Sequence, residues 1–155
     1  MNVFGMNHKK NNTGQPPPGD PLHEKSYFDN APVAIYVTDI KGNIIDYNQK
    51  FSELTGISAD CGLPVNFGDF IHNQDVAFVE KEKKNKQTER KGWDLEYRII
   101  NKDITTWVKD ISNAVTNEND VITSFCGSLT DITEKKMKET GCTKNIEKYK
   151  EILKA

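Results

Sequence analysis

A regular alternation of apolar and polar side chains constrains the second half of the chain to extended strands. In the run WDLEYRII, at residues 93–100, large apolar side chains occupy every second position and charged side chains lie between them. Since successive side chains of a strand point to opposite faces of a sheet, this run predicts a strand with one buried face. Two further runs, at 105–115 and 120–132, follow after turns at 101–103 and 117–120. The three runs predict an antiparallel meander.

In the last of these strands, alternate residues share one face, namely Val121, Thr123, Phe125, Gly127 and Leu129. The residues between them, which share the other face, are Ile122, Ser124, Cys126 and Ser128. The first set is the more apolar, as expected for a sheet that is covered on one side.

The first half combines a β-hairpin with short helices. Residues 33–39 and 43–47 are rich in β-branched residues and flank a Lys-Gly-Asn turn, which predicts a hairpin. Asn48 is the predicted N-cap of a short helix, because its side-chain oxygen can accept from a free helix amide. Asp75 is the predicted cap of a longer helix, whose end at 80–91 is interpreted as a solvated mixed-charge surface. This order of elements predicts an α+β fold with helices on one face of an antiparallel sheet.

Length and composition indicate one domain with polar ends. The 155 residues are 35% hydrophobic and 28% charged, which suits a single small core. Residues 1–21 are rich in Pro, Gly and Asn and are predicted to be a disordered linker. The folded domain with its flanking helix is expected over 22–133, and a C-terminal helix over 134–155.

Charge and cysteine content narrow the partners and the compartment. The net charge of −2, from 21 basic and 23 acidic residues, offers no excess for binding nucleic acid or anionic membranes. The three cysteines have no paired spacing, which favours free thiols in a reducing compartment. No run reaches the roughly 18 apolar residues of a membrane span. We therefore expect a cytoplasmic chain, which is compatible with a membrane anchor elsewhere in a longer parent.

Four segments carry a resemblance to a known family. They are FDNAPVAIYVTDIKGNIIDYNQKFSELTG, DFIHNQD, EYRIINKD followed by TWV, and GSLTDITEKK. In this order they resemble the PAS domain family, over roughly residues 25–133. The resemblance implies a five-stranded antiparallel sheet with its first and last strands side by side, and short helices that enclose a small-molecule pocket. It also implies a sensory or dimerisation module upstream of an output domain such as a histidine kinase.

The same resemblance assigns structural framework roles to four residues, namely Asp39, Gly42, Asn48 and His72. A single His supplies little of a metal coordination shell, so His72 is not expected to bind a metal. One departure from the family lies at Ile104, where many relatives have Gly. Because a β-branched residue disfavours positive φ, we expect this turn to be of another type, or to be set by Asn101 or Asp103.

Five large side chains are candidate walls of a ligand pocket, namely Tyr36, Ile99, Trp107, Phe125 and Leu129. Such residues are more often plain core than ligand walls, so two functions stay open. In the first, the domain binds a small organic ligand. In the second, a filled core serves a module that dimerises and relays signals from a neighbour. An atypical flavin or haem sensor is a third alternative.

Two cofactor chemistries of the family are disfavoured. The resemblance places Phe67 where flavin photosensors carry a reactive Cys, and Leu129 where they carry a Gln that binds the flavin ring. The segment DVAFVEKEKKNKQT lacks the His with which haem-binding relatives ligate iron. The chain also has no phosphate-binding loop, no nucleophile motif and no His pair at metal spacing, so we expect neither a metal site nor enzyme activity.

The segment Asp131–Thr133 joins the last strand directly to a charged helix. Thr133 is expected to cap that helix with its hydroxyl, Ile132 to stay in the core, and Asp131 to accept a hydrogen bond at the strand end. The resemblance implies that this junction relays changes in the domain to an output helix, with a histidine kinase as the leading output. A strand end with a helix cap is a sufficient alternative.

The C-terminal tail predicts pairing with a second copy. A coiled-coil seam is formed at spacings of four, three and four by Cys142, Ile146, Tyr149 and Leu153. This seam favours a homodimer, and docking of the helix onto its own domain is the alternative. The tail also resembles the start of a further PAS repeat, so neighbouring domains of a longer parent chain are expected partners.

Overall fold

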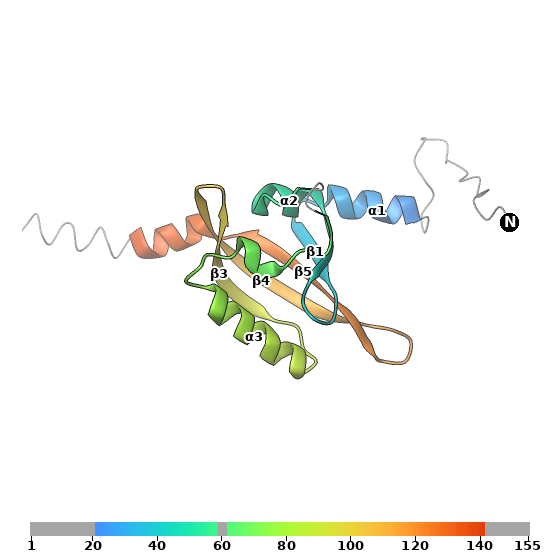
Figure 1. Cartoon of the computed structure of the whole chain (residues 1–155). Coiled ribbons are helices and arrows are strands. Elements are labelled where there is room, and N and C mark those ends of the chain that lie inside the picture. Colours follow the sequence, from blue (N-terminus) through green and yellow to red (C-terminus); the bar gives the residue numbers. More distant parts are fainter. Residues whose placement is uncertain (1–20, 59–61, 142–155) are drawn as a thin grey trace, which may run out of the picture.

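The computed structural model describes residues 21–58 and 62–141, which form one antiparallel sheet with helices packed against it (Figure 1). The helices are α1 (Pro21–Asn30), α2 (Gln49–Thr55), the 3-10 helix η2 (Phe67–Phe70) and α3 (Val76–Thr88). The strands are β1 (Ala34–Thr38), β2 (Ile44–Tyr47), β3 (Asp94–Asn101), β4 (Ile104–Thr116) and β5 (Ile122–Asp131). A last helix begins at residue 133 and is described to residue 141. The predicted linker at 1–21 and the coiled-coil seam beyond residue 141 lie almost wholly outside the described residues.

The five strands lie in the order β2-β1-β5-β4-β3, and each neighbouring pair is antiparallel. β1 and β5 are far apart in the sequence but lie side by side, with Tyr36 paired to Gly127. The predicted α+β fold is confirmed, including the meander of β3, β4 and β5 and the adjacent first and last strands.

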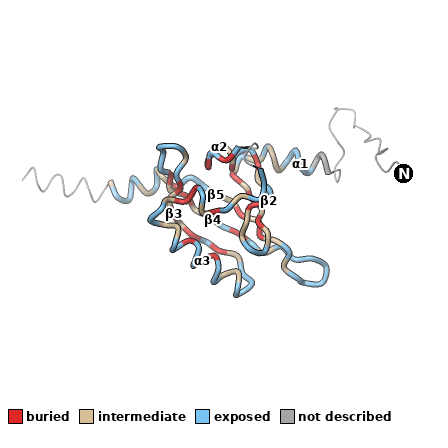
Figure 2. The backbone as a smooth tube through the Cα atoms, in the orientation of Figure 1, coloured by how far each residue is buried: buried red, intermediate tan, exposed pale blue. Residues whose placement is uncertain are grey.

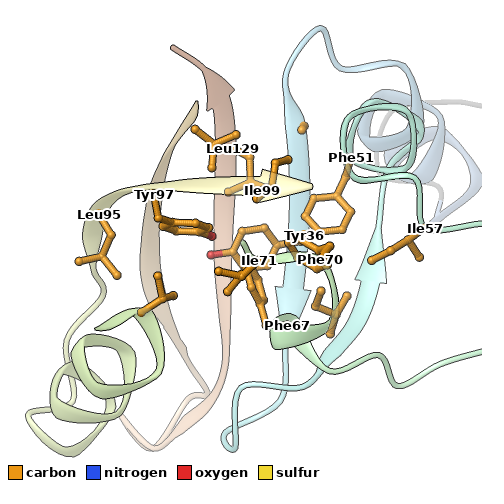
Figure 3. Close-up of a cluster of buried hydrophobic side chains, with 14 of the residues drawn as sticks. Tyr36, Phe51, Ile57, Phe67, Phe70, Ile71, Leu95, Tyr97, Ile99 and Leu129 are labelled. Atoms are coloured by element: carbon orange, nitrogen blue, oxygen red, sulfur yellow. The ribbon is translucent and has the colours of Figure 1, made fainter. Parts of the chain in front are cut away.

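The core lies on one face of the sheet, where α2, η2 and α3 cover it (Figures 2 and 3). Along β3 and most of β5 every second residue is buried, so the predicted period of two is confirmed there. The prediction is wrong at the start of β5, where Val121 and Thr123 are exposed while Ile122 packs against the core. A register irregularity between Val115 and Thr116 explains the difference, because it shifts which residues of this hairpin face the core.

Gly127 lets the Tyr36 side chain cross β5. A Cβ atom at position 127 would collide with the ring and the hydroxyl of Tyr36. With no side chain there, the Tyr36 side chain passes over β5 and its hydroxyl reaches Asp110 on β4. The glycine in the last strand is therefore required by a close approach, as glycines inside strands often are.

The β1–β2 turn is held by the framework residues that the resemblance picked out. Asp39 accepts hydrogen bonds from the backbone amides of Lys41 and Asn43, both at 2.9 Å, and from Asn43 Nδ2 at 3.1 Å. Gly42 adopts a φ of 92°, which favours glycine because other residues are strained there. Together they fix the hairpin that the sequence predicted.

The N-terminus of α3 is fixed to β3 instead of being capped by its own side chain. Asp75 occupies the N-cap position, but its side chain makes no capping hydrogen bond, so that prediction is wrong. Its carboxylate binds Arg98, at 2.7 Å from Nη2 and 2.8 Å from the backbone amide. The Arg98 hydrogen bond holds the pKa of Asp75 below its usual value. Nearby, His72 donates its backbone amide to the Arg98 carbonyl at 2.9 Å, a structural role.

The left-handed residue of the β3–β4 turn is neither of the two residues, Asn101 and Asp103, that were expected to set it. Lys102 adopts the left-handed conformation, with φ of 55°, and neither Asn101 nor Asp103 does so. The Asn101 side chain is occupied elsewhere, since its Nδ2 donates to the carbonyl of Glu53 at 3.3 Å. This contact ties the turn to the end of α2.

Asn48 connects three elements through one buried side chain. Its Oδ1 accepts from the amide of Phe51 at 3.0 Å, which confirms the predicted N-cap of α2, and from the amide of Ile35 at 2.9 Å. Its Nδ2 donates to the carbonyls of Phe28 at 3.0 Å and Val33 at 2.9 Å. The side chain thus holds the end of α1, the start of β1 and the start of α2 together.

We expect Asn48→Asp to destabilise the domain by about 3 kcal/mol, because each buried carbonyl left without a donor costs about 1–3 kcal/mol. The carboxylate keeps the two acceptor contacts but loses both donor contacts. Urea unfolding followed by circular dichroism measures the change. Asn113→Asp, at an exposed position of β4, is the matched control and should change the free energy of unfolding by less than about 0.5 kcal/mol. Equal effects of the two substitutions would contradict the role given to Asn48.

Candidate functional site

The interior beneath the sheet is filled by aromatic side chains (Figure 3). Tyr36 lies against Phe67 with ring centroids 4.9 Å apart, and against Phe51 at 5.5 Å. Phe67 in turn lies 4.8 Å from Phe70. These rings occupy the space in which the resemblance placed a small-molecule pocket.

A carboxylate lies within this aromatic interior. Asp110, on the inner face of β4, is fully buried. Its Oδ1 accepts the Tyr36 hydroxyl at 2.6 Å, and its Oδ2 accepts the Tyr97 hydroxyl at 2.8 Å. Figure 3 shows the two tyrosine hydroxyls pointing toward one another across the core. Lys83 Nζ, reaching in from α3, lies 2.9 Å from Oδ2 and completes an ion pair.

Aromatic faces surround the Lys83 ammonium on its remaining sides. The distances from Nζ to the ring centroids are 3.0 Å for Phe67, 4.9 Å for Trp93, and 5.6 Å for both Tyr36 and Tyr97. The Nζ atom is shut off from solvent, and its contact with Asp110 lacks the alignment of a hydrogen bond. The ammonium is therefore held by charge and by cation–π attraction. We call this group of four rings and the Asp110 carboxylate the ammonium cage.

Burial decides the protonation of the groups in the cage. It lowers the pKa of Lys83 to about 8, although Asp110 acts in the opposite direction. Burial, followed by the charge of Asp110, raises the pKa of Tyr36 and of Tyr97 well above the usual value. Both tyrosines consequently stay neutral donors to Asp110 throughout the physiological range.

A groove of about 520 Å³ adjoins the cage between α3, η2 and the β1–β2 turn. Lys83 and Phe67 belong to both the cage and the groove wall. Polar side chains line the groove, namely Lys41, Asn43, Asn66, Glu80, Lys84 and Gln87. Ile71 and Val79 supply apolar surface. The groove links the buried ion pair with the surface of the domain.

The five predicted pocket residues separate into two groups. Tyr36, Ile99, Phe125 and Leu129 lie together in the core, and of these Tyr36 belongs to the cage. Trp107 lies on the opposite face of the sheet, so the prediction that it lines the same interior is wrong. There its ring centroid is 5.4 Å from Arg98 Cζ and 5.1 Å from Lys136 Nζ.

Sequence reasoning missed both members of the ion pair. Lys83 lies in the run interpreted as a solvated helix surface, yet it continues the inward face of α3 that begins with Val76 and Val79. That spacing of three and four was the available signal. Asp110 had a weaker signal, because three of the four buried positions of β4 are polar and the strand carries large apolar residues on both faces.

The junction between β5 and the last helix is attached to β4 at Trp107. The Ile132 amide donates to the Trp107 carbonyl at 2.8 Å, and the Trp107 amide donates to Thr133 Oγ1 at 3.0 Å. The Thr133 hydroxyl thus joins the helix to the sheet, and the prediction that it caps the helix is wrong. Asp131 Oδ1 accepts from the Thr133 amide at 2.9 Å, which gives the acceptor role expected for it. Ile132 is buried, as predicted.

The last helix also contacts the outer face of the sheet through Lys136. Its Nζ lies 2.6 Å from Glu96 Oε2 on β3, and it stands over the Trp107 ring. The Lys136 hydrogen bond lowers the pKa of Glu96. Residues 133–141 are therefore joined to β3, β4 and β5 together.

The comparison with protein families agrees with this architecture. The family model for a PAS domain matches residues 32–134. The chain belongs to the PAS domain family. A PAS domain is a sensory module, and the family membership expected from the four resembling segments is confirmed. No curated protein matches the chain significantly.

Solved structures share the PAS fold with this chain. The PAS domain of a Colwellia psychrerythraea protein is 26% identical with a TM-score of 0.63, over 72% of this chain and 95% of that one. A sensory box histidine kinase/response regulator from Burkholderia thailandensis is 21% identical with a TM-score of 0.61, over 83% and 98%. The Rhodobacter sphaeroides LOV protein is 17% identical with a TM-score of 0.61, over 69% and 64%.

The described part of the PAS domain lacks two kinds of feature. Within residues 21–58 and 62–141, no group of three or more His, Cys, Asp or Glu side chains could hold a metal ion. No helix in the same ranges is long and apolar enough to cross a membrane.

Breaking the ion pair on one side should be more harmful than replacing both partners. We expect Lys83→Met to lower the free energy of unfolding by about 3–5 kcal/mol, because Asp110 is left as an uncompensated buried charge. The double variant Lys83→Met, Asp110→Asn should recover most of that loss. Urea unfolding of four proteins, namely the wild type, the single variants Lys83→Met and Asp110→Asn and the double variant, gives the coupling. Lys84→Met on the exposed side of α3 is the control. Additive losses in the double variant would show that the pair is not coupled.

The lowered pKa of Lys83 predicts a pH dependence of stability. The folded protein releases the Lys83 proton near pH 8, whereas the unfolded chain keeps it until near its ordinary pKa of 10.5. Between these values the unfolded state binds more protons, so this contribution to the free energy of unfolding rises with pH, by up to about 1.4 kcal/mol per unit. The unfolding free energy of the wild type, minus that of the double variant, should be flat below about pH 8 and rise toward about pH 9.5. A flat difference throughout would contradict the lowered pKa.

Proposed function

We propose that this PAS domain relays signals between its buried ion pair and the helix that begins at residue 133. The observation that carries the proposal is the position of Asp110 and Trp107 on the same strand. Asp110 faces the core and holds Lys83, while the backbone of Trp107 binds Ile132 and Thr133. A change in the charge or position of Lys83 would act on β4, and β4 holds the exit helix.

The attachment of the exit helix supports this route. The hydrogen bonds of Trp107 leave the strand–helix junction little freedom to move independently of β4. The ion pair of Lys136 with Glu96 extends the attachment by one helical turn. Such a junction transmits a shift of the strand into the direction of the helix. Asp131, Ile132 and Thr133 are the relay residues in this proposal.

The packed interior supports a relay that works through a small rearrangement. Bulky rings fill the space beneath the sheet, which favours a module with a filled core over one that encloses a large cofactor. Small-ligand sensing is the second candidate, and the groove beside the cage favours it. In that case the core side of the ligand site would be lined by Tyr36, Ile99, Phe125 and Leu129.

We further propose that the output domain is a histidine kinase and that the module works as a homodimer in the cytoplasm. The likeness to a sensory box histidine kinase/response regulator supports the first point. The homodimer is supported by two exposed apolar side chains on the outer sheet face, Ile111 and Val115. The cytoplasmic location is supported by the free thiol of Cys126, because thiols stay reduced in the cytoplasm.

We expect the double variant Lys83→Met, Asp110→Asn to alter amide hydrogen exchange at the junction, because the relay connects the ion pair to it. Exchange of the Ile132 and Lys136 amides, resolved by NMR, should change about fivefold or more, which corresponds to about 1 kcal/mol. Lys84→Met should leave both amides unchanged. Changes confined to α3 and β4 would contradict a relay to the exit helix.

Thr133→Val tests the junction itself. It keeps the shape of the side chain but removes the acceptor for the Trp107 amide, so exchange of that amide should become faster. Thr130→Val, at an exposed site of β5, is the matched control. An unchanged rate at Trp107 would show that the Thr133 hydroxyl does not hold the junction.

A further inference from the structure

The ammonium cage has the composition of a binding site for an organic ammonium ion. Four aromatic rings face Lys83 Nζ, at centroid distances from 3.0 to 5.6 Å. The Asp110 carboxylate adds a buried negative charge at 2.9 Å. Aromatic faces attract amines and methylated ammonium groups, and a carboxylate supplies the counter-charge. In this structure the occupant of the cage is a side chain of the protein itself.

The contacts of the Lys83 ammonium in the cage favour its exchange for another ammonium ion. The Lys83 ammonium makes no aligned hydrogen bond in the cage, and burial lowers its pKa to about 8, so its charged form is better accommodated in water. Glu80 lies one turn earlier on α3, lines the groove and makes no ion pair within the described residues. A protonated lysine that leaves the cage would find this carboxylate at a favourable helical spacing of three residues.

The groove supplies a route into the cage. It has a volume of about 520 Å³, and Phe67 and Lys83 form the boundary between groove and cage. Ile71 and Val79 line it with apolar surface that suits a hydrocarbon body. Lys41 and Lys84 on its wall disfavour a second positive charge on the ligand.

We propose that the cage binds a small organic monoammonium compound, which enters through the groove and displaces the Lys83 ammonium toward Glu80. A neutral ligand would leave Asp110 as an unpaired buried charge, so the ligand must be a cation. The inference deepens the proposed function, on which it rests for its role in signalling. Exchange of one ammonium for another would free α3 from β4 while the charge of Asp110 stays balanced.

The test is a titration of the wild-type chain with n-butylammonium chloride, which reproduces the side chain of Lys83. Binding is followed by NMR on the Trp93 indole N–H, which donates to Tyr36 Oη at 3.1 Å inside the cage. The indole signal of Trp107 on the opposite face is the internal control and should not move. n-Butanol, a neutral analogue of the same shape, should give no saturable shift at Trp93. No shift with n-butylammonium, or equal shifts with both compounds, would overturn the proposal.

Two variants sharpen the result. Lys83→Ala removes the competing occupant, so n-butylammonium should bind at least tenfold more tightly than to the wild type. Asp110→Asn removes the counter-charge and should weaken binding at least tenfold. Binding to Lys83→Ala without binding to the wild type would also overturn the proposal, because Lys83 would then be a fixed part of the core. If either variant fails to fold, the wild-type titrations with the two compounds decide alone.

Failure of this inference and failure of the relay give different results. Saturable binding at Trp93 with unchanged amide exchange at Ile132 and Lys136 would sustain the ammonium site and contradict the relay. Absence of binding, together with altered amide exchange in the double variant Lys83→Met, Asp110→Asn, would sustain the relay and contradict the ammonium site.

Discussion

The buried carboxylate of Asp110 sets the arrangement of the elements around it. A charged group without contact to water requires donors and a counter-charge, and these come from different parts of the chain. Tyr36 comes from β1, Tyr97 from β3 and Lys83 from α3. Each of these side chains must therefore reach the Asp110 carboxylate on β4. The same requirement explains Gly127, because only a residue without a side chain lets Tyr36 cross β5.

The energetics of the ion pair favour a functional role over a purely stabilising one. At 2.9 Å the attraction of two unit charges is about 6 kcal/mol for an effective dielectric constant of about 20. Removing each ion from water costs several kcal/mol, so the two effects nearly cancel. A pair of this kind contributes little net stability but is very sensitive to the loss or exchange of one partner. That sensitivity is what a sensory module needs.

β4 carries two sites on its opposite faces, and this links the interior to the exit of the chain. The inner face presents Asp110, and the outer face presents the Trp107 ring between Arg98 and Lys136. The backbone of Trp107 also binds Ile132 and Thr133. β4 forms hydrogen bonds to both of its neighbours, β3 and β5. In the proposed relay, this short segment of β4 carries a displacement of the ion pair to the junction.

The sequence by itself determined the strands, the hairpin, the Asn48 cap and the order of elements, because these follow from local periodicity and turn chemistry. It also identified the segment Asp131–Thr133 as a junction. Only the tertiary structure decided that Lys83 is buried, that Trp107 faces outward and that Asp75 and Thr133 bind distant strands instead of capping their helices. The physical reason is that a polar side chain takes the partner that folding brings nearest. That partner comes from strand pairing across long stretches of sequence, and local patterns do not encode it.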